Sequence, residues 1–428
     1  MNRILLTASI LCLFTLSFLQ AQDRDVIAGI PVNYDESKTG DYTQGLPDLL
    51  TFENGKKVTR PSQWAKRRKE ILNIVETNQF GKVPAKRPAL RYDKRDDIAL
   101  DGAALRRQVR LFFSPDDDST YVDVLIYLPK EANAPVPLLL NLSFSPNNLV
   151  VDDPGVWTGR RWDPKTGKCS PAKGNGPRGM AMNDVIKKYL TEGYGFATLC
   201  YTDIEPDFLG GMNLGVRKFY LKEGQTEFAP DEWGAISTWS WGVSYVIDYM
   251  EKDKDIDAGR LALTGCSRLG KTTLWTGARD SRIAVVIPSC SGEGGAASSR
   301  RNFGETVAHL TAPTRYPYQF ARNYGKCGED VYSMPMDAHM LIALVAPRPL
   351  LLQTGLTDNW SDAKGEFLSA TLASSVYELL GKGAFGASEF PEPEQPVFTT
   401  LGYVMHDGGH AVLPQDWDYY LQFIKRYL

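Results

Sequence analysis

The chain has 428 residues, which is long for a single domain at the usual ~100–200 residues, although α/β enzymes often exceed that length as one unit. Its 43% hydrophobic and 23% charged residues are close to the average of globular proteins and exclude an intrinsically disordered chain. The 48 basic and 51 acidic residues give a net charge of −3, which argues against a nucleic-acid-binding protein, because such proteins carry a basic excess. Six cysteines are too few for a disulfide-dense scaffold.

Residues 1–21 are predicted to be a secretory signal peptide. A positive charge at Arg3 precedes an apolar run from Ile4 to Leu19, and the small residue Ala21 follows, which is the usual layout of such a peptide. The run is shorter than the ~20 apolar residues of a membrane-spanning helix, so we expect no membrane span. Cleavage near Ala21 would yield a secreted or periplasmic protein with five cysteines, at least one of which is free or paired between chains.

Residues 22–60 are polar, contain Gly, Pro and Asp, and are predicted to form an extended N-terminal arm. A single catalytic domain is expected over residues 61–428. It begins with an amphipathic helix from Ser62 to Phe80, for which Ser62 is a suitable N-cap. Two apolar segments, Leu105–Phe113 and Thr120–Leu128, flank a turn rich in Asp and Pro and indicate an antiparallel strand pair.

From Val136 onward, short apolar runs without alternation are separated by helical segments. Such runs are typical of strands buried on both faces of a mostly parallel sheet. The predicted fold class is therefore α/β, a three-layer sandwich with a mostly parallel central sheet. The segment from Pro146 to Gly179 is rich in Pro, Gly, Asn and Lys and is expected to be a surface insertion at the active-site face.

A serine lies between a predicted strand and a predicted helix in the stretch Arg260–Arg279. The apolar strand ends in Gly265, Cys266 and Ser267, and a helix with an apolar face follows. A serine two residues after a glycine, at such a junction, is typical of the nucleophile elbow of α/β-hydrolases. The sharp turn exposes the serine hydroxyl and points backbone amides at a developing oxyanion. The usual second glycine is displaced to Gly270, so an ordinary strand-to-helix junction is the alternative interpretation.

Asp358 and His410 are predicted to complete a catalytic triad with Ser267. The α/β-hydrolases have the chain order serine, acid, histidine. Asp358 follows an apolar run that ends at Gly355, and His410 lies in a glycine-flanked loop before a closing helix over residues 414–428. The acid would orient the imidazole, and the imidazole would activate the serine.

The remaining histidines are weaker candidates for the base. His406 lacks a comparable flexible setting, although it lies only four residues before His410. His339 is expected to be structural, in a helix that leads into the strand after Arg348. His309 is expected at the surface or behind the site.

Six short motifs accompany these residues: Gly265–Lys271 (GCSRLGK), Ser291–Ala296 (SGEGGA), Asp337–His339 (DAH), Ala346–Pro349 (APRP), Asp358–Trp360 (DNW) and Asp203–Phe208 (DIEPDF). Together they resemble the glucuronoyl esterases, carbohydrate esterase family fifteen, over most of the chain from about Trp64 to His410. The serine-arginine-x-glycine-lysine string is the specific part. The resemblance implies an α/β-hydrolase fold and hydrolysis, without a cofactor or metal, of the ester between 4-O-methyl-glucuronate of xylan and lignin alcohols.

The resemblance also implies roles for four further residues. Arg268 resembles the arginine that stabilises the oxyanion, a task that suits a fixed cation with fork-like donors. Lys271 resembles the lysine that holds the uronate hydroxyls. Glu305 and Trp360 resemble the glutamate and tryptophan that hold the sugar, although simple loop packing is the alternative for Trp360.

Two departures from the family pattern stand out. Many members carry their acid twenty-three residues after the serine, where this chain has Cys290. The acid role therefore falls to Asp358, a position that other members use, with Glu293 and Asp362 ranked below it. A sugar-contacting glutamine has no clear counterpart here, and Gln319 is the nearest.

A disulfide between Cys266 and Cys290 is predicted. Both residues follow apolar strands, neighbouring strands lie ~4.8 Å apart, and Cα separations of about 4.4–6.8 Å suit a bridge. Two buried free thiols are the alternative. We expect a monomer that binds no nucleic acid. Two alternative functions are another carbohydrate esterase, such as an acetylxylan esterase, and a non-catalytic carbohydrate-binding protein on the same fold.

Overall fold

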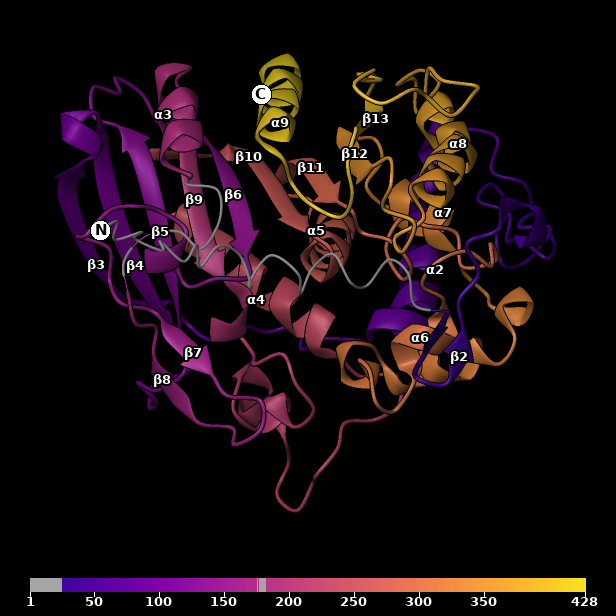
Figure 1. Ribbon diagram of the computed structural model, residues 1–428, viewed down its shortest axis with the longest axis horizontal. Coiled ribbons are helices and arrows are strands. Elements are labelled where there is room, and N and C mark those ends of the chain that lie inside the picture. The colour runs from indigo at the N-terminus through magenta and orange to yellow at the C-terminus, as the bar shows by residue number, and fades with distance from the viewer. Residues whose placement is uncertain (1–24, 175, 177–181) are drawn as a thin grey trace, which may run out of the picture.

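The structure, a computed structural model, describes residues 25–174, 176 and 182–428. The expected signal peptide and its cleavage site near Ala21 lie outside the described residues. A nine-stranded sheet with the order β13-β12-β11-β10-β6-β9-β5-β4-β3 forms the centre of the molecule (Figure 1). In chain order the strands are β3 (Arg91–Ala99), β4 (Ala104–Phe112), β5 (Tyr121–Pro129), β6 (Val136–Ser143), β9 (Gly195–Cys200), β10 (Ile256–Cys266), β11 (Ile283–Ser289), β12 (Leu350–Gly355) and β13 (Leu401–His406).

The sheet has a parallel part and an antiparallel part. The strands from β9 through β6, β10, β11 and β12 to β13 pair in parallel, whereas β3, β4, β5 and β9 pair antiparallel. Every residue of β9, β12 and β13 is buried. Burial of both faces explains why these strands appear in the sequence as continuous apolar runs.

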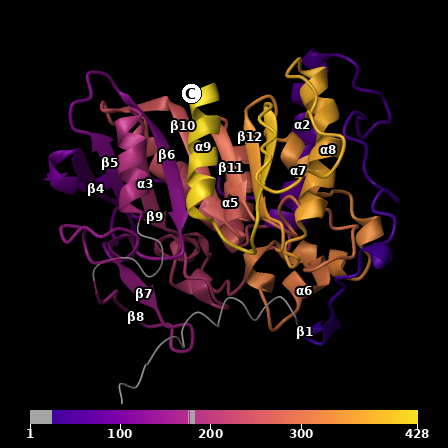
Figure 2. The same ribbon diagram turned by 45° about the horizontal axis from the view of Figure 1, so that its top comes forward.

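Helices cover the two faces of the sheet, as the cartoons show from two angles (Figures 1 and 2). One face packs against α3 (Asn183–Thr191) and α9 (Pro414–Tyr427). The other packs against α2 (Pro61–Val75), α4 (Ala235–Met250), α5 (Arg268–Arg279), α7 (Ala338–Ala343) and α8 (Ala363–Leu379). Successive leucines of β6 point to opposite faces of the sheet. Leu139 packs on the face covered by α3 and α9, whereas Leu138 and Leu140 pack on the face covered by α4 and α5. The predicted three-layer α/β arrangement is confirmed.

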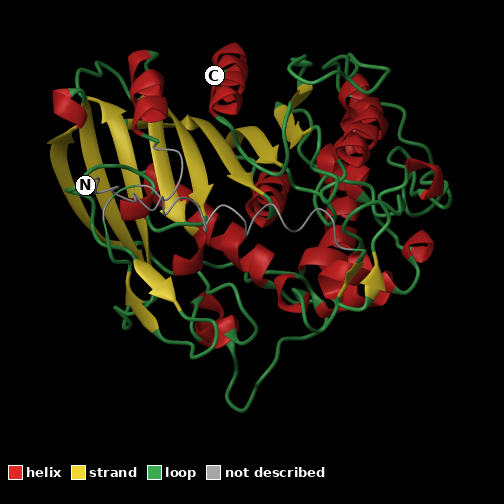
Figure 3. Cartoon of the chain, viewed as in Figure 1, coloured by secondary structure: helices red, strands yellow, loops and turns green. Residues whose placement is uncertain are grey.

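Two predicted elements differ in detail from the structure. The first helix starts at Pro61 rather than at Ser62, and its last five residues, Glu76–Phe80, widen into a π-helical turn. The insertion after Pro146 contains a short hairpin of β7 (Arg160–Trp162) and β8 (Cys169–Pro171). This hairpin lies beyond the carboxyl ends of the parallel strands (Figure 3), where an α/β sheet places its binding surfaces.

The N-terminal arm packs against the catalytic domain. It contains a small hairpin of β1 (Val26–Ile27) and β2 (Ile30–Pro31) and is otherwise mostly irregular. The carbonyl oxygen of Asn33 accepts a hydrogen bond from the amide of Gly304, 2.8 Å away. The division of the chain near residue 60 stays a prediction. No helix within the described ranges is long and apolar enough to cross a membrane.

Candidate active site

Four adjacent parallel strands each present a chemically reactive side chain just beyond their carboxyl ends. Ser267 follows β10, Cys290 follows β11, Asp358 follows β12, and His410 follows β13. Because these strands are neighbours in the sheet, residues that are distant in the sequence meet at one edge. Ser267 and His410 line the same cavity.

Ser267 has the backbone geometry of a strained turn between β10 and α5. Its φ of 61° and ψ of −126° are rare for a residue with a side chain, and such strain is typical of functional positions. Its amide donates to the carbonyl oxygen of Ser289 at 2.9 Å. A Cβ atom at Gly270 would clash with that same carbonyl. Gly270, the displaced second glycine of the motif, therefore allows α5 to pack close to the end of β11, where a side chain would not fit.

His410 is held by two partners. Its Nδ1 atom lies 2.7 Å from Oδ2 of Asp358 and 3.0 Å from the hydroxyl oxygen of Ser361. Asp358 is buried, and Oδ1 of the same carboxylate accepts the amide of Ser361 at 3.2 Å. The structure thus brings together the three residues predicted as a triad, and adds Ser361, which the sequence analysis missed.

The two members of this pair shift each other's pKa in opposite directions. Burial raises the pKa of Asp358, but the hydrogen bond and charge of His410 outweigh burial and leave the pKa below its ordinary value. Burial alone would lower the pKa of His410, but the hydrogen bond and charge of Asp358 raise it to about 9. The site therefore favours an ionised aspartate beside a basic imidazole.

Arg268 directs its guanidinium to Asp207, with which it forms an ion pair. Asp207 also accepts hydrogen bonds from the Tyr318 hydroxyl at 3.0 Å and from the Gln319 side-chain amide at 2.8 Å. Gln319 is thus part of the cavity lining, next to Arg268. The guanidinium carbon of Arg268 lies 4.8 Å from the centre of the Tyr316 ring.

The remaining wall of the cavity combines charged and aromatic side chains. Nζ of Lys271 lies 3.8 Å from one carboxylate oxygen of Glu305, and the Arg315 guanidinium donates to the other oxygen at 3.1 Å. The guanidinium of Arg315 also lies 5.6 Å from the Trp360 ring centre. The backbone of Glu305 donates to the carbonyl of Trp360 at 2.9 Å. Lys271, Glu305 and Trp360 therefore lie together, and Arg315 is an additional residue that the sequence did not point to.

The two lower-ranked acids lie in other hydrogen-bond networks. Glu293 accepts from the hydroxyls of Ser299 and Tyr324, at 2.6 and 3.0 Å, and burial raises its pKa to about 8. Asp362 pairs with Arg301 and caps the start of α8, and burial raises its pKa to about 6. Both side chains thus hydrogen-bond to segments other than the loop that contains His410.

The other three histidines hydrogen-bond to groups outside the cavity that contains Ser267. His406 is buried and lies 2.8 Å from Asp416, and its Nε2 lies 2.9 Å from the carbonyl of Gly409, beneath the loop that carries His410. His339 contacts the carbonyl of Pro47 at 2.9 Å. His309 is buried behind the site, its ring centre 5.5 Å from that of Trp360.

Cys266 and Cys290 are free thiols in the structure, and they are hydrogen-bonded neighbours. The hydrogen bond from Cys290 lowers the pKa of Cys266, although burial opposes the shift. The sulfur of Cys290 and ligand atoms of Asp358 and His410 lie within 4.8 Å of one another, which is the one metal-ligand-like group among the described residues. The predicted disulfide stays a prediction.

Comparison with known proteins agrees with this geometry. A family profile described as "Glucuronyl esterase, fungi" matches residues 219–381. The chain is 40% identical to "Carbohydrate esterase MZ0003", from an unknown prokaryotic organism, over 99% of this chain and 98% of that one. A solved structure of a CE15 esterase from a marine bacterial metagenome is 40% identical, covers 93% of this chain and 100% of that chain, and superposes with a TM-score of 0.81. The chain belongs to carbohydrate esterase family 15, the glucuronoyl esterases.

Solved structures of the family have the same fold. A glucuronoyl esterase from Solibacter usitatus is 44% identical, covers 91% of this chain and 99% of its own, and superposes with a TM-score of 0.86. A second, from Teredinibacter turnerae, is 29% identical with a TM-score of 0.78 and covers 93% and 92%. The α/β-hydrolase fold and the family resemblance predicted from the motifs are therefore confirmed, and the protein is a carboxylic ester hydrolase.

Proposed function

We propose that this esterase hydrolyses the ester between (4-O-methyl-)glucuronic acid of xylan and an alcohol of lignin, through a glucuronoyl-enzyme intermediate. One observation carries the proposal. Ser267, in its strained turn, shares a cavity with His410 and with Lys271, Glu305 and Trp360. The cavity thus combines the groups for acyl transfer with donors, an acceptor and an aromatic ring for a sugar.

In the first half of the reaction Ser267 Oγ attacks the ester carbonyl carbon, and Nε2 of His410 takes the Oγ proton. The carbonyl electron pair moves onto oxygen, where Arg268 and backbone amides at the start of α5 stabilise the negative charge. The intermediate collapses, the bond to the alcohol oxygen breaks, and His410 returns the proton to that oxygen. Asp358 keeps the imidazole in the tautomer that presents Nε2 to the serine.

In the second half His410 takes a proton from water, and the resulting hydroxide attacks the glucuronoyl carbonyl. A second oxyanion forms at the same position and collapses to release the uronate, while the proton returns to Ser267 Oγ. Each step uses only side chains, backbone amides and water, so we propose that the enzyme needs no cofactor and no metal.

The sugar contacts follow from the charges in the cavity wall. Lys271 and Arg315 supply hydrogen-bond donors on either side of the Glu305 carboxylate, and that carboxylate is an acceptor for hydroxyl protons. Trp360 offers an apolar face for the sugar ring. A site that hydrogen-bonds particular hydroxyls rejects analogues lacking them, because its buried polar groups are then unpaired.

Two experiments test this proposal against its alternatives. Initial rates on benzyl glucuronate should exceed those on acetylated xylan by a wide margin, whereas an acetylxylan esterase would show the reverse. A non-catalytic binding protein would turn over neither substrate. Ser267→Ala provides the control that assigns any turnover to this site rather than to a contaminant.

We further propose that the protein is exported, with cleavage near Ala21, and acts as a monomer on glucuronoxylan or lignin–carbohydrate esters outside the cytoplasm. The apolar run Ile4–Leu19 supports export. N-terminal sequencing of the protein recovered from its host tests the cleavage position, and light scattering tests the oligomeric state.

A further inference from the structure

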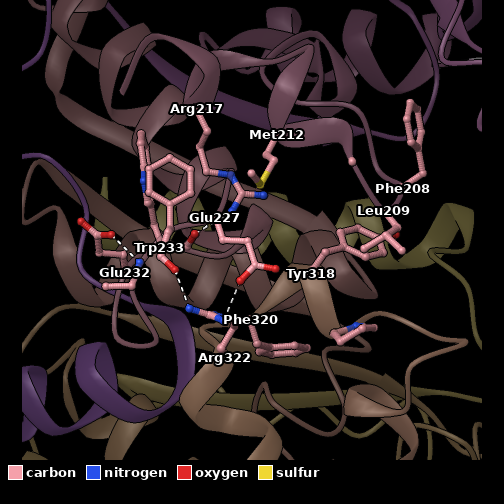
Figure 4. A pocket seen from close by; sticks show the side chains of 14 residues that line it. Phe208, Leu209, Met212, Arg217, Glu227, Glu232, Trp233, Tyr318, Phe320 and Arg322 are labelled. Atoms are coloured by element: carbon pink, nitrogen blue, oxygen red, sulfur yellow. Dashed lines mark hydrogen bonds and ion pairs between the residues drawn. The ribbon is translucent and has the colours of Figure 1, made fainter. Parts of the chain in front are cut away.

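A second cavity, larger and more apolar than the catalytic one, opens on the same side of the sheet. Its volume is about 210 Å³, against about 70 Å³ for the cavity that contains Ser267. Large apolar and aromatic side chains form half of its lining: Phe208, Leu209, Met212, Phe228, Trp233, Tyr318 and Phe320. In Figure 4, Phe208 and Leu209 lie across the cavity from Trp233. Leu209 lines the cavity and is 75% exposed, so this apolar side chain contacts solvent at the edge of the cavity.

The charged groups around this cavity already have partners. Arg217 is buried and donates to both oxygens of Glu205 and to the carbonyl of Trp233. Arg322 donates to Glu227 and to the carbonyl of Phe228, each at 2.8 Å. Because these charged groups are paired, the surface that a ligand would contact in the cavity is mainly apolar. A sugar would lose water from its hydroxyls there without gaining hydrogen bonds, whereas an aromatic ring would bury apolar area.

The cavity adjoins the catalytic site through one carboxylate. Asp207 pairs with Arg268 on the catalytic side and accepts the hydroxyl of Tyr318, which lines the apolar cavity, on the other. The uronate wall of Lys271, Glu305 and Trp360 belongs to the catalytic cavity. With the acyl group held there, we place the alcohol of the ester on the Arg268 side of Ser267, toward the apolar cavity. Asp207 and Tyr318 lie between Arg268 and the apolar cavity, so we expect the cavity to receive a part of the alcohol beyond its first group.

We propose that this cavity binds an aromatic ring of the alcohol half of the substrate, one ring removed from the ring that carries the ester oxygen. The inference rests on the proposed function, because it assumes a glucuronoyl ester as substrate. Its size fits: a dry cavity of about 150 Å³ lined by aliphatic and aromatic side chains is enough to hold benzene. The enzyme would thereby distinguish oligomeric aromatic alcohols from simple ones without contacting the reacting atoms.

The test compares three glucuronate esters that differ only in the alcohol: methyl, benzyl and 4-(benzyloxy)benzyl, with no, one and two rings. We expect wild type to have a kcat/KM for the two-ring ester about tenfold above that for the benzyl ester, a ratio typical of one well-filled apolar contact. Ala229 is exposed and lines the cavity, so Ala229→Phe fills it from the surface. This variant should reduce the kcat/KM for the two-ring ester to that for the benzyl ester and leave the kcat/KM for the methyl ester unchanged.

A matched control and a second variant complete the design. Thr226 is exposed on the same loop and does not line the cavity, so Thr226→Phe should leave all three rates unchanged. Leu209→Ser should lower the two-ring preference by about threefold to fivefold, because it removes the apolar entrance. Circular dichroism establishes that each variant is folded.

Two sets of results would overturn the inference by different routes. A wild type that hydrolyses the methyl and benzyl esters but shows no two-ring preference, or an Ala229→Phe variant that loses activity equally on all three, would reject the aromatic site alone. A wild type that hydrolyses none of the three esters would reject the proposed function, and the aromatic site with it.

Discussion

The imidazole of His410 and the carboxylate of Asp358 meet at 2.7 Å because the strands that precede them are paired in register. Gly355, the last residue of β12, lies opposite His406, the last residue of β13. Asp358 comes three residues after one strand end and His410 four residues after the other. The pairing of β12 with β13 therefore sets the distance between the two residues, and the short loops after the strands only orient the two side chains.

Asp358, rather than Glu293, is predicted to be the acid that orients His410. Asp358→Asn should lower kcat by on the order of 10⁴, because an amide favours the wrong imidazole tautomer. Glu293→Gln should cost far less, since its carboxylate hydrogen-bonds Ser299 and Tyr324. Steady-state kinetics on benzyl glucuronate measure both. The reverse order of losses would move the acid assignment to Glu293 and leave Ser267 and His410 in place.

Ser267→Ala is expected to fold normally and to lose nearly all activity. Removal of a triad member typically costs on the order of 10⁴–10⁶ in kcat. Thermal unfolding of the variant serves as the control for folding. A kcat within tenfold of wild type would reject Ser267 as the nucleophile.

The rate should rise with pH well above neutrality. His410 accepts a proton only when neutral, and Asp358 raises its pKa to about 9 despite burial. Below that pKa, kcat/KM should therefore fall about tenfold for each unit of pH. Asp358→Asn removes the partner that raises the pKa, so the imidazole of that variant should titrate at lower pH. An NMR titration of the imidazole follows the shift, and an unchanged pKa in the variant would contradict this account.

A disulfide between Cys266 and Cys290 is expected in protein recovered from an oxidising compartment. The two thiols are already neighbours, so bridging would need little movement of the strand ends. Peptide mapping under non-reducing conditions should recover both cysteines in one cross-linked fragment. Recovery of both as separate alkylated peptides, without prior reduction, would contradict the prediction.

Glucuronate esters should be preferred over galacturonate esters, which differ in one hydroxyl configuration. Lys271→Met would remove a buried donor beside Glu305, and we expect it to raise KM and to narrow the ratio between the two epimers. The ratio of kcat/KM for the two methyl esters measures this effect. Equal values in the wild type would remove the hydroxyl-reading roles of Lys271 and Glu305.

The sequence predicted most of the sheet and the positions of the strand-end residues, because both leave local signals, but it did not predict β3 or β13. Buried parallel strands are continuous apolar runs, and Ser267, Asp358 and His410 each follow such a run or a glycine-rich loop. Arg315, Ser361 and Asp207 were missed as site residues, because an ordinary polar residue in an irregular segment acquires its role only from what the fold places beside it. The β7–β8 hairpin was missed for a similar reason: its strands have three residues each, too few to show a pattern.

The N-terminal arm has a consequence for any shortened version of this enzyme. Asn33 bonds to the backbone of Gly304, directly before Glu305, and the carbonyl of Ile30 lies 3.3 Å from Nε2 of His309, whose ring in turn lies against Trp360. The arm thus packs behind the cavity wall that we propose to bind the sugar. For a chain trimmed to begin at α2, we expect the sheet and the Asp358–His410 pair to remain and the proposed binding of the uronate to weaken, through residues that do not contact the sugar.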